Sequence, residues 1–263
     1  MSKHLVLLPG WGLGVVPLQI LAEQLDAALP QLTVQIQPLP DVRGKSTEAL
    51  IALLDQQLPS DCWLMGWSLG GMLATALAAY RQSACAGLIS YASNPCFVAR
   101  DTWPAAMPVD TFTAFRQLCA EDLAAGLKRF VLLCSQGAAQ PRALSRQLLA
   151  TAEAGDSVCA LAGLDLLAEL DNRAAISAFE GPQLHLLAEQ DALVPSLALS
   201  SMRELNAQAT VELFGQSHAG LIVESQLLAQ RIADFILRGQ HDLVFRATGE
   251  QQASGCRSIF TRR

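Results

Sequence analysis

The segment Gly66-Trp67-Ser68-Leu69-Gly70-Gly71 joins a strand-like apolar run to a helix-like one, and it constrains the fold more than any other feature of the chain. A Gly-x-Ser-x-Gly pattern in this setting predicts a sharp turn that holds a serine hydroxyl above the end of a parallel sheet. The flanking glycines let neighbouring backbone approach without Cβ clashes. The helix behind the turn directs free N–H groups at the same point, which favours a negatively charged oxygen there. We therefore predict that Ser68 is a nucleophile; the alternative is a glycine-rich turn without function.

Short apolar runs rich in β-forming residues alternate with helical patterns along most of the chain. Strands are expected at 4–8, 33–37, 62–66, 86–91, 183–187 and 210–214, and helices at 17–29, 47–58, 69–80 and 227–237. This alternation predicts an α/β protein with the α/β-hydrolase fold, a mostly parallel central sheet flanked by helices. Residues 1–94 and 181–239 would form the core, and the helix-like stretch 95–180 an inserted lid. The polar and basic stretch 240–263 would be a flexible tail.

The composition argues against several classes of protein. The 263 residues are 51% hydrophobic with a formal net charge of −6, so a folded core is expected and no basic surface for nucleic acid. No apolar stretch reaches the roughly 18 residues of a membrane span, and the start lacks a secretory signal pattern. We expect a cytoplasmic monomer that does not associate with membranes. The seven cysteines form no C-x-x-C pair, which favours small core residues over disulfides or a zinc site.

A serine hydroxyl is a weak nucleophile at neutral pH and needs an adjacent base, which in this fold follows the serine in the chain. Four histidines compete for that role. His4 precedes the serine, His185 lies inside a strand-like run, and His241 lies in the irregular tail. His218, in the loop GQSHAG between a strand and the last helix, is therefore the predicted base; an ordinary surface histidine is the alternative.

The third member of a triad orients the imidazole and stabilises its charged form. Asp191 follows the strand-like QLHLLAEQ, which places it at the carboxyl end of a strand, where catalytic groups gather in open α/β sheets. Asp165 and Asp171 are rivals by order in the chain, but they lie in the helical stretch. A turn-forming role is the other interpretation of Asp191.

An oxyanion hole needs two N–H donors. Leu69, directly after the nucleophile, is expected to supply one, and Trp11 in the loop Pro9-Gly10-Trp11-Gly12 the other. The rings of Trp11 and Trp67 would either wall the acyl pocket or pack as core aromatics. The serine, the base and these donors supply the chemistry, so we expect no metal and no organic cofactor.

Several segments together resemble one enzyme family. The matching segments are PGWGLG after the first strand, GWSLGG at the turn that carries Ser68 (the nucleophile elbow), SNPCFVARDTWPA where the lid begins, DALVP and GQSHAG. From about Leu5 to Leu237 the chain is similar to the pimeloyl-acyl carrier protein methyl ester esterases of biotin synthesis. The elbow and triad are shared with many hydrolases, whereas the segment from Cys96 to Pro104 is more specific. The resemblance implies that Ser68 attacks the ester carbonyl and expels methanol, after which water releases the free acid.

The resemblance also implies which residues meet the substrate. These are Trp11, Ser68, Leu69 and His218, together with the lid segment Phe130, Val131, Leu132, Leu133 and Cys134, for which a buried helix is the alternative. The implied partner is an acyl carrier protein bearing a pimeloyl methyl ester, an acidic protein met by basic lid residues. The candidates for that contact are Lys128, Arg129, Arg142 and Arg146, each of which is otherwise an ordinary solvated charge.

Three functions remain open from the sequence. The first is the biotin-pathway esterase, and the second is a general short-chain carboxylesterase with the same triad. Substrate preference separates these two. The third is a hydrolase-fold protein that binds a small ligand without turning it over, and covalent labelling of Ser68 by a fluorophosphonate would argue against it.

Overall fold

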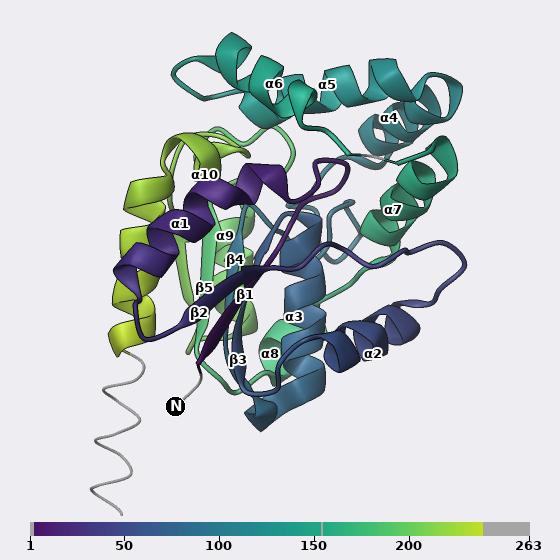
Figure 1. The fold of residues 1–263 in the computed structure, drawn as a ribbon. Coiled ribbons are helices and arrows are strands. Elements are labelled where there is room, and N and C mark those ends of the chain that lie inside the picture. The colour runs from purple at the N-terminus through teal and green to yellow at the C-terminus, as the bar shows by residue number, and fades with distance from the viewer. Residues whose placement is uncertain (1–2, 154, 239–263) are drawn as a thin grey trace, which may run out of the picture.

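The apolar runs of the sequence form one central sheet. The computed structural model describes residues 3–153 and 155–238, and in them six strands pair in parallel in the order β2-β1-β3-β4-β5-β6 (Figure 1). The strands are β1 (His4–Leu8), β2 (Thr33–Ile36), β3 (Cys62–Trp67), β4 (Cys85–Tyr91), β5 (Gln183–Leu187) and β6 (Thr210–Leu213). Strands β3 and β5 are buried along their whole length, as expected where helices cover both faces of a parallel sheet. The predicted α/β-hydrolase architecture is confirmed.

Helices cover both faces of this sheet. The helices of the described residues, including those that do not cover the sheet, are η1 (Val16–Leu18), α1 (Gln19–Ala28), α2 (Thr47–Gln57), α3 (Leu69–Arg81), η2 (Gln82–Ala84), α4 (Val109–Glu121), α5 (Leu123–Ser135), α6 (Pro141–Ala150), α7 (Ser157–Glu169), α8 (Arg173–Ala178), α9 (Ala198–Leu205) and α10 (Gly220–Val223), followed by helix at 225–238. In Figure 1, α1 and the final helix lie on one side of the sheet, and α2, α3 and α8 lie on the other. A ring contact between Trp63 of β3 and Phe235 of the final helix, with centroids 6.0 Å apart, joins one of these layers to the sheet.

The element boundaries agree closely with those expected from the sequence. β1 and β5 begin and end at the expected residues, and the other strands differ by one residue at an end. The helix expected at 17–29 starts as the 3₁₀ turn η1 with Pro17 in its first turn, and becomes α-helical only at Gln19. Proline is tolerated there because a first-turn N–H has no intrahelical partner.

Four helices, α4 to α7, stand above the carboxyl ends of the strands (Figure 1). They lie within the stretch 95–180, between β4 and β5. The only β-pairing among the described residues of this stretch is in two isolated bridges, Val98 with Met107 and Arg100 with Trp103. This arrangement fits an inserted helical lid, whose exact limits remain a prediction. The tail predicted at 240–263 lies outside the described residues.

The cysteines of the described chain are free thiols, and all but one are buried. The five buried ones are Cys62, Cys85, Cys96, Cys119 and Cys134. Burial raises the pKa of Cys85 to about 12, because a thiolate would lose its hydration there. The expectation that most cysteines are small core residues is confirmed for this part of the chain.

Among the same residues, no helix is long and apolar enough to cross a membrane.

Candidate active site

Ser68 stands at the turn between β3 and α3 in a strained backbone conformation. Its φ of 55° and ψ of −119° lie in a region that L-residues rarely adopt. The turn is held by two hydrogen bonds: the Ser68 N–H donates to the Tyr91 carbonyl at 3.0 Å, and the Ser93 hydroxyl donates to the Ser68 carbonyl at 3.0 Å. A side chain at Gly66 would overlap the Gly70 carbonyl, so the tight turn requires glycine there.

His218 and Asp191 meet at the carboxyl ends of β6 and β5. Nδ1 of His218 lies 2.8 Å from Oδ2 of Asp191, and both side chains are fully buried. The other carboxylate oxygen of Asp191 accepts hydrogen bonds from the backbone N–H groups of Leu193 at 2.8 Å and Val194 at 2.9 Å. Nε2 of His218 is buried and makes no hydrogen bond within the described residues. The carboxylate thus fixes one ring nitrogen and leaves the other available.

The loop that carries His218 is tied to the core and to the lid. The Trp67 indole N–H donates to the His218 carbonyl at 2.8 Å, and the Tyr91 hydroxyl donates to the Ser217 carbonyl at 3.0 Å. From the lid side, the Ala219 N–H donates to the carbonyl of residue 134 at 3.0 Å. Trp67 is buried, and its ring lies beside that of His218, with centroids 5.9 Å apart; a role of this ring as a wall of the acyl pocket remains a prediction. The sequence reasoning missed Tyr91; its place at the carboxyl end of a buried strand was the available signal.

The loop after β1 passes close to Ser68. A Cβ atom on Gly10 would lie 3.5 Å from the Ser68 Cβ, an ordinary van der Waals contact. The backbone of this loop therefore lies next to the serine side chain. The Trp11 ring is buried under the lid, where its Nε1–H donates to the Ala160 carbonyl of α7 at 2.8 Å. It also meets Phe130 of α5 edge to face, with ring centroids 4.9 Å apart. The loop expected to supply an oxyanion donor is therefore held by lid helices.

Two cavities adjoin this loop, and Trp11 lines both. The larger, of about 380 Å³, is bordered by Gly10, Leu69 and Arg43 among others. The smaller, of about 70 Å³, lies between core and lid and is mainly apolar, with Phe130 part of its wall. Trp11 therefore borders two spaces, of which the larger also reaches Leu69, directly after Ser68.

The lid segment expected to touch substrate occupies the last two turns of α5. Phe130 and Leu133 line the smaller cavity, and Val131 and Cys134 are buried. Leu132 faces outward and is 52% exposed. A contact with the substrate therefore remains a prediction for this segment, with Phe130 and Leu133 best placed and Leu132 least well placed.

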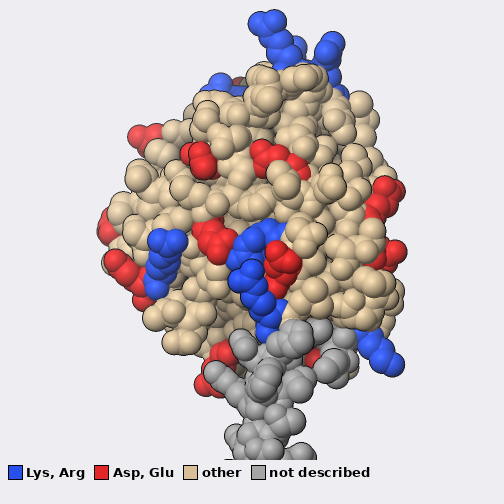
Figure 2. All heavy atoms as spheres, turned by 90° about the vertical axis from the view of Figure 1, so that its left-hand side faces the viewer, with Lys and Arg blue, Asp and Glu red and all other residues tan. Residues whose placement is uncertain are grey.

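The four basic residues expected to meet a carrier protein lie on α5 and α6, and all are exposed: Lys128, Arg129, Arg142 and Arg146. None forms an ion pair with another described residue. Figure 2 shows Lys and Arg side chains projecting at the top of the molecule, the end at which α5 and α6 lie in Figure 1. This end of the lid therefore presents positive charges that no ion pair with a described residue neutralises.

The residues rejected from the triad have other partners. Asp165 pairs with Arg116 at 2.6 Å and Asp171 with Arg173 at 2.6 Å, both away from His218. His185 is buried in β5, where burial lowers its pKa to about 4 and keeps it neutral. Within the described residues, no cluster of three or more His, Cys, Asp or Glu side chains could hold a metal ion.

Comparison with known proteins places this chain in a family. The family model for the alpha/beta hydrolase fold matches residues 46–225. The pimeloyl-acyl-carrier protein methyl ester esterase of Aeromonas salmonicida is 34% identical over 89% of this chain and 96% of its own length. The chain belongs to this esterase family of α/β hydrolases. It is a carboxylic ester hydrolase by that membership.

Other relatives show how family members are built. The biotin biosynthesis bifunctional protein BioHC of Cellvibrio japonicus is 41% identical over 88% of this chain. The chain spans about half of that bifunctional protein, 47% of its length. It matches 95% of the pimeloyl-acyl-carrier protein methyl ester esterase of Vibrio cholerae at 29% identity.

Solved structures of the same fold are more distant in sequence. A bromoperoxidase from Bacillus anthracis superposes with a TM-score of 0.74 at 17% identity, covering 90% of this chain and 92% of its own. An esterase from Exiguobacterium antarcticum gives a TM-score of 0.72 at 18% identity, covering 89% and 92%. These structures support the fold, because identities this low say nothing about substrate.

Proposed function

We propose that this chain hydrolyses the methyl ester of pimeloyl-acyl carrier protein in biotin synthesis, through a Ser68–His218–Asp191 triad and an acyl-enzyme. The observation that carries the proposal is the buried pair of His218 and Asp191, 2.8 Å apart, with the second ring nitrogen free at the same sheet edge as Ser68. The substrate is inferred from the names of the relatives.

In the first half of the reaction, Ser68 Oγ attacks the carbonyl carbon of the methyl ester. Nε2 of His218 takes the serine proton, because Asp191 keeps the other ring nitrogen protonated. The carbonyl oxygen becomes an oxyanion, for which the backbone N–H groups of Trp11 and Leu69 are the proposed donors. The C–O bond to the methoxy group then breaks, methanol leaves with the proton from His218, and the acyl group stays on Ser68.

In the second half, water replaces methanol. His218 takes a proton from the water as its oxygen attacks the acyl carbon, and the same donors stabilise the second oxyanion. The bond to Ser68 breaks and the serine regains its proton. The product is a free carboxylate on the carrier-bound chain.

The positive end of the lid supports a carrier protein as partner. Arg142 and Arg146 are exposed one turn apart on α6, and Lys128 and Arg129 are exposed on α5. Arg129 also lines the smaller cavity, so positive charge extends from the outer surface to an apolar space beside Trp11. An acidic carrier docked there would present its acyl chain to that space, because opposite charges favour the encounter.

The test compares two substrates. Turnover of a pimeloyl-acyl carrier protein methyl ester and of p-nitrophenyl butyrate is measured for the natural chain and for Ser68→Ala. We expect a higher kcat/KM for the carrier-bound ester and loss of both activities in Ser68→Ala. Equal use of the two esters would favour a general carboxylesterase instead. Retained turnover in Ser68→Ala would refute the nucleophile.

A charge reversal tests the carrier surface separately. Arg146→Glu should raise KM for the carrier-bound ester roughly 3- to 10-fold, because it places a negative charge against an acidic partner. KM for p-nitrophenyl butyrate should not change. The matched control is Lys3→Glu, an equal charge change on an exposed residue just before β1, at the opposite end of the strands. An equal effect of both variants would contradict docking at α6.

A further inference from the structure

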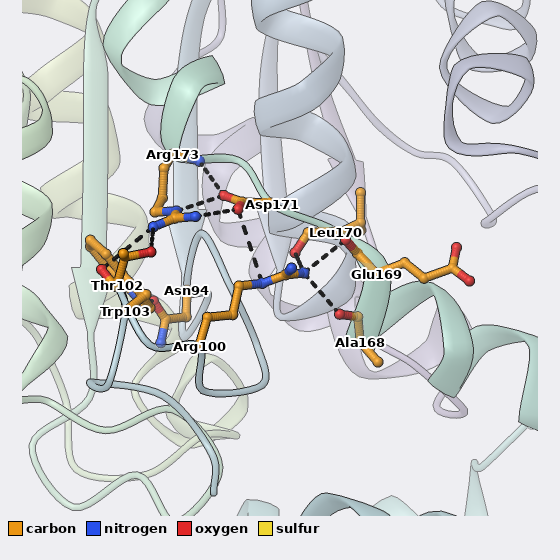
Figure 3. Close-up of polar contacts among 9 residues, drawn as sticks. All are labelled: Asn94, Arg100, Thr102, Trp103, Ala168, Glu169, Leu170, Asp171 and Arg173. Carbon is orange, nitrogen blue, oxygen red and sulfur yellow. Dashed lines mark hydrogen bonds and ion pairs between the residues drawn. The ribbon is translucent and has the colours of Figure 1, made fainter. Parts of the chain in front are cut away.

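The lid-entrance segment, residues 96–104, forms a network of polar contacts with the end of the lid. Figure 3 shows Arg100 reaching the carbonyl groups at the end of α7. Its Nη2 lies 3.0 Å from the Ala168 oxygen, 2.9 Å from that of Glu169 and 3.5 Å from that of Leu170. The last carbonyl groups of a helix have no intrahelical partners, and a cation there also opposes the helix dipole. One arginine thus caps the carboxyl end of α7.

A second arginine closes the network. Arg173 makes a two-pronged contact with Asp171, at 2.9 and 2.6 Å, and donates to the Thr102 hydroxyl at 2.6 Å (Figure 3). Nε of Arg100 lies 4.0 Å from the same Asp171 carboxylate. Residues 100–102 and 168–173, far apart in the chain, are thereby bound together. The ends of the lid are joined at one point.

The other half of α7 contacts the loop after β1. Its Ala160 carbonyl accepts the Trp11 Nε1–H bond, and a Cβ on Gly163 would lie 2.7 Å from Trp11 Cδ1, so the indole ring packs directly on the helix backbone. Just before α7, the Glu153 N–H donates to the Gly12 carbonyl at 3.0 Å. The Trp11 loop is therefore in direct contact with α7 and with the residue that leads into it.

We propose that Arg100 is a positioning residue for the oxyanion loop, acting through α7 on Trp11. The helix is a rigid link, and roughly 13 Å separate Ala160 from the capped end at 1.5 Å per residue. Holding the capped end fixes the axis of α7, and the Trp11 ring packed on it sets the direction of the Trp11 backbone N–H. This inference rests on the proposed function, in which that N–H stabilises the oxyanion.

The variant that tests the proposal is Arg100→Met, which keeps an apolar stem and removes the caps. With p-nitrophenyl butyrate we expect kcat to fall about 10-fold with KM within about twofold, because a misplaced catalytic group slows the transition state more than it weakens binding. Arg100→Lys should restore part of kcat, since an ammonium can still cap carbonyls. The control is Arg116→Met. This variant removes the α4 arginine that pairs with Asp165 of α7 but leaves the capped end of α7 intact.

Two readouts separate positioning from mere stability. Affinity for a trifluoromethyl ketone, whose adduct with Ser68 carries an oxyanion, should fall in parallel with kcat at a temperature where the variant is folded by circular dichroism. In a double-mutant cycle with Trp11→Phe, which lacks the indole N–H, Arg100→Met should add little further loss, because both act through one contact. If Arg100→Met does not fold, Arg100→Lys enters the same cycle.

Three results would overturn the proposal: unchanged kcat in a folded Arg100→Met, multiplicative losses in the cycle, or an equal loss in Arg116→Met. Ser68→Ala is measured alongside. Retained turnover in that variant would mean that the proposed serine mechanism has failed. An inactive Ser68→Ala with an unaffected Arg100→Met would refute the role of Arg100 alone.

Discussion

Asp191→Asn is expected to reverse the roles of the two ring nitrogens of His218. One carboxylate oxygen of Asp191 accepts two backbone N–H groups, from Leu193 and Val194, and the other faces Nδ1 of His218 at 2.8 Å. An asparagine must keep its oxygen toward the two N–H donors, so its NH₂ group faces His218. Nδ1 then has to accept a hydrogen bond, the ring proton moves to Nε2, and that nitrogen cannot take the proton of Ser68.

The expected size of the effect follows from this geometry. A triad histidine in the wrong tautomer lowers kcat by about 10⁴-fold, or about 5 kcal/mol in activation free energy. All three hydrogen bonds at position 191 persist, the one to His218 with its direction reversed, so the fold and KM should change little. The assay is steady-state hydrolysis of p-nitrophenyl butyrate, with thermal unfolding measured on the same samples.

The matched control is Asp165→Asn, which changes an aspartate that pairs with Arg116 on the lid. It should leave kcat within about twofold, because a partly exposed ion pair contributes little. A kcat for Asp191→Asn within tenfold of the natural chain would refute the tautomer argument. A change confined to KM would point to another acid.

Three further predictions concern stability and reactivity. Gly66→Ala should destabilise the fold by about 3 kcal/mol in urea unfolding, because the methyl group overlaps the Gly70 backbone. Burial lowers the folded-state pKa of His185 from 6.5 to about 4, so the unfolded state binds a proton first as pH falls. The free energy of unfolding should therefore drop by roughly 3 kcal/mol between pH 6.5 and 4. The drop over the same pH range should be smaller in His185→Gln. Iodoacetamide should modify the part-exposed Cys159 before Cys85, whose burial raises its pKa to about 12.

Each of these has a clear contrary result. Unchanged unfolding of Gly66→Ala would mean that the turn can relax; the matched control is Gly10→Ala, where the nearest atoms would lie 3.5 Å from the new Cβ and nothing overlaps. Equal pH dependence with and without His185 would assign the proton uptake to other groups. Peptide mapping that finds Cys85 modified first would contradict its burial in solution.

The sequence alone predicted the elements and the three members of the candidate triad, Ser68, His218 and Asp191. Apolar runs of four to seven residues and helical spacing are local patterns, which is why β1 and β5 were expected at the residues where they occur. Ser68 was predicted because the turn it occupies needs glycines at fixed offsets, and His218 because only one histidine follows the serine in a loop before the last helix. These are features that a short stretch of chain carries by itself.

Only the tertiary structure decided which side chains meet. Asp191 and His218 are 27 residues apart, and their 2.8 Å contact exists because β5 and β6 are parallel neighbours whose carboxyl ends share one edge of the sheet. Arg100 contacts the carbonyl groups of residues about 70 positions further along, a pairing that no periodicity encodes. Local sequence sets the conformation of a segment, whereas these contacts depend on how the whole lid closes onto the sheet.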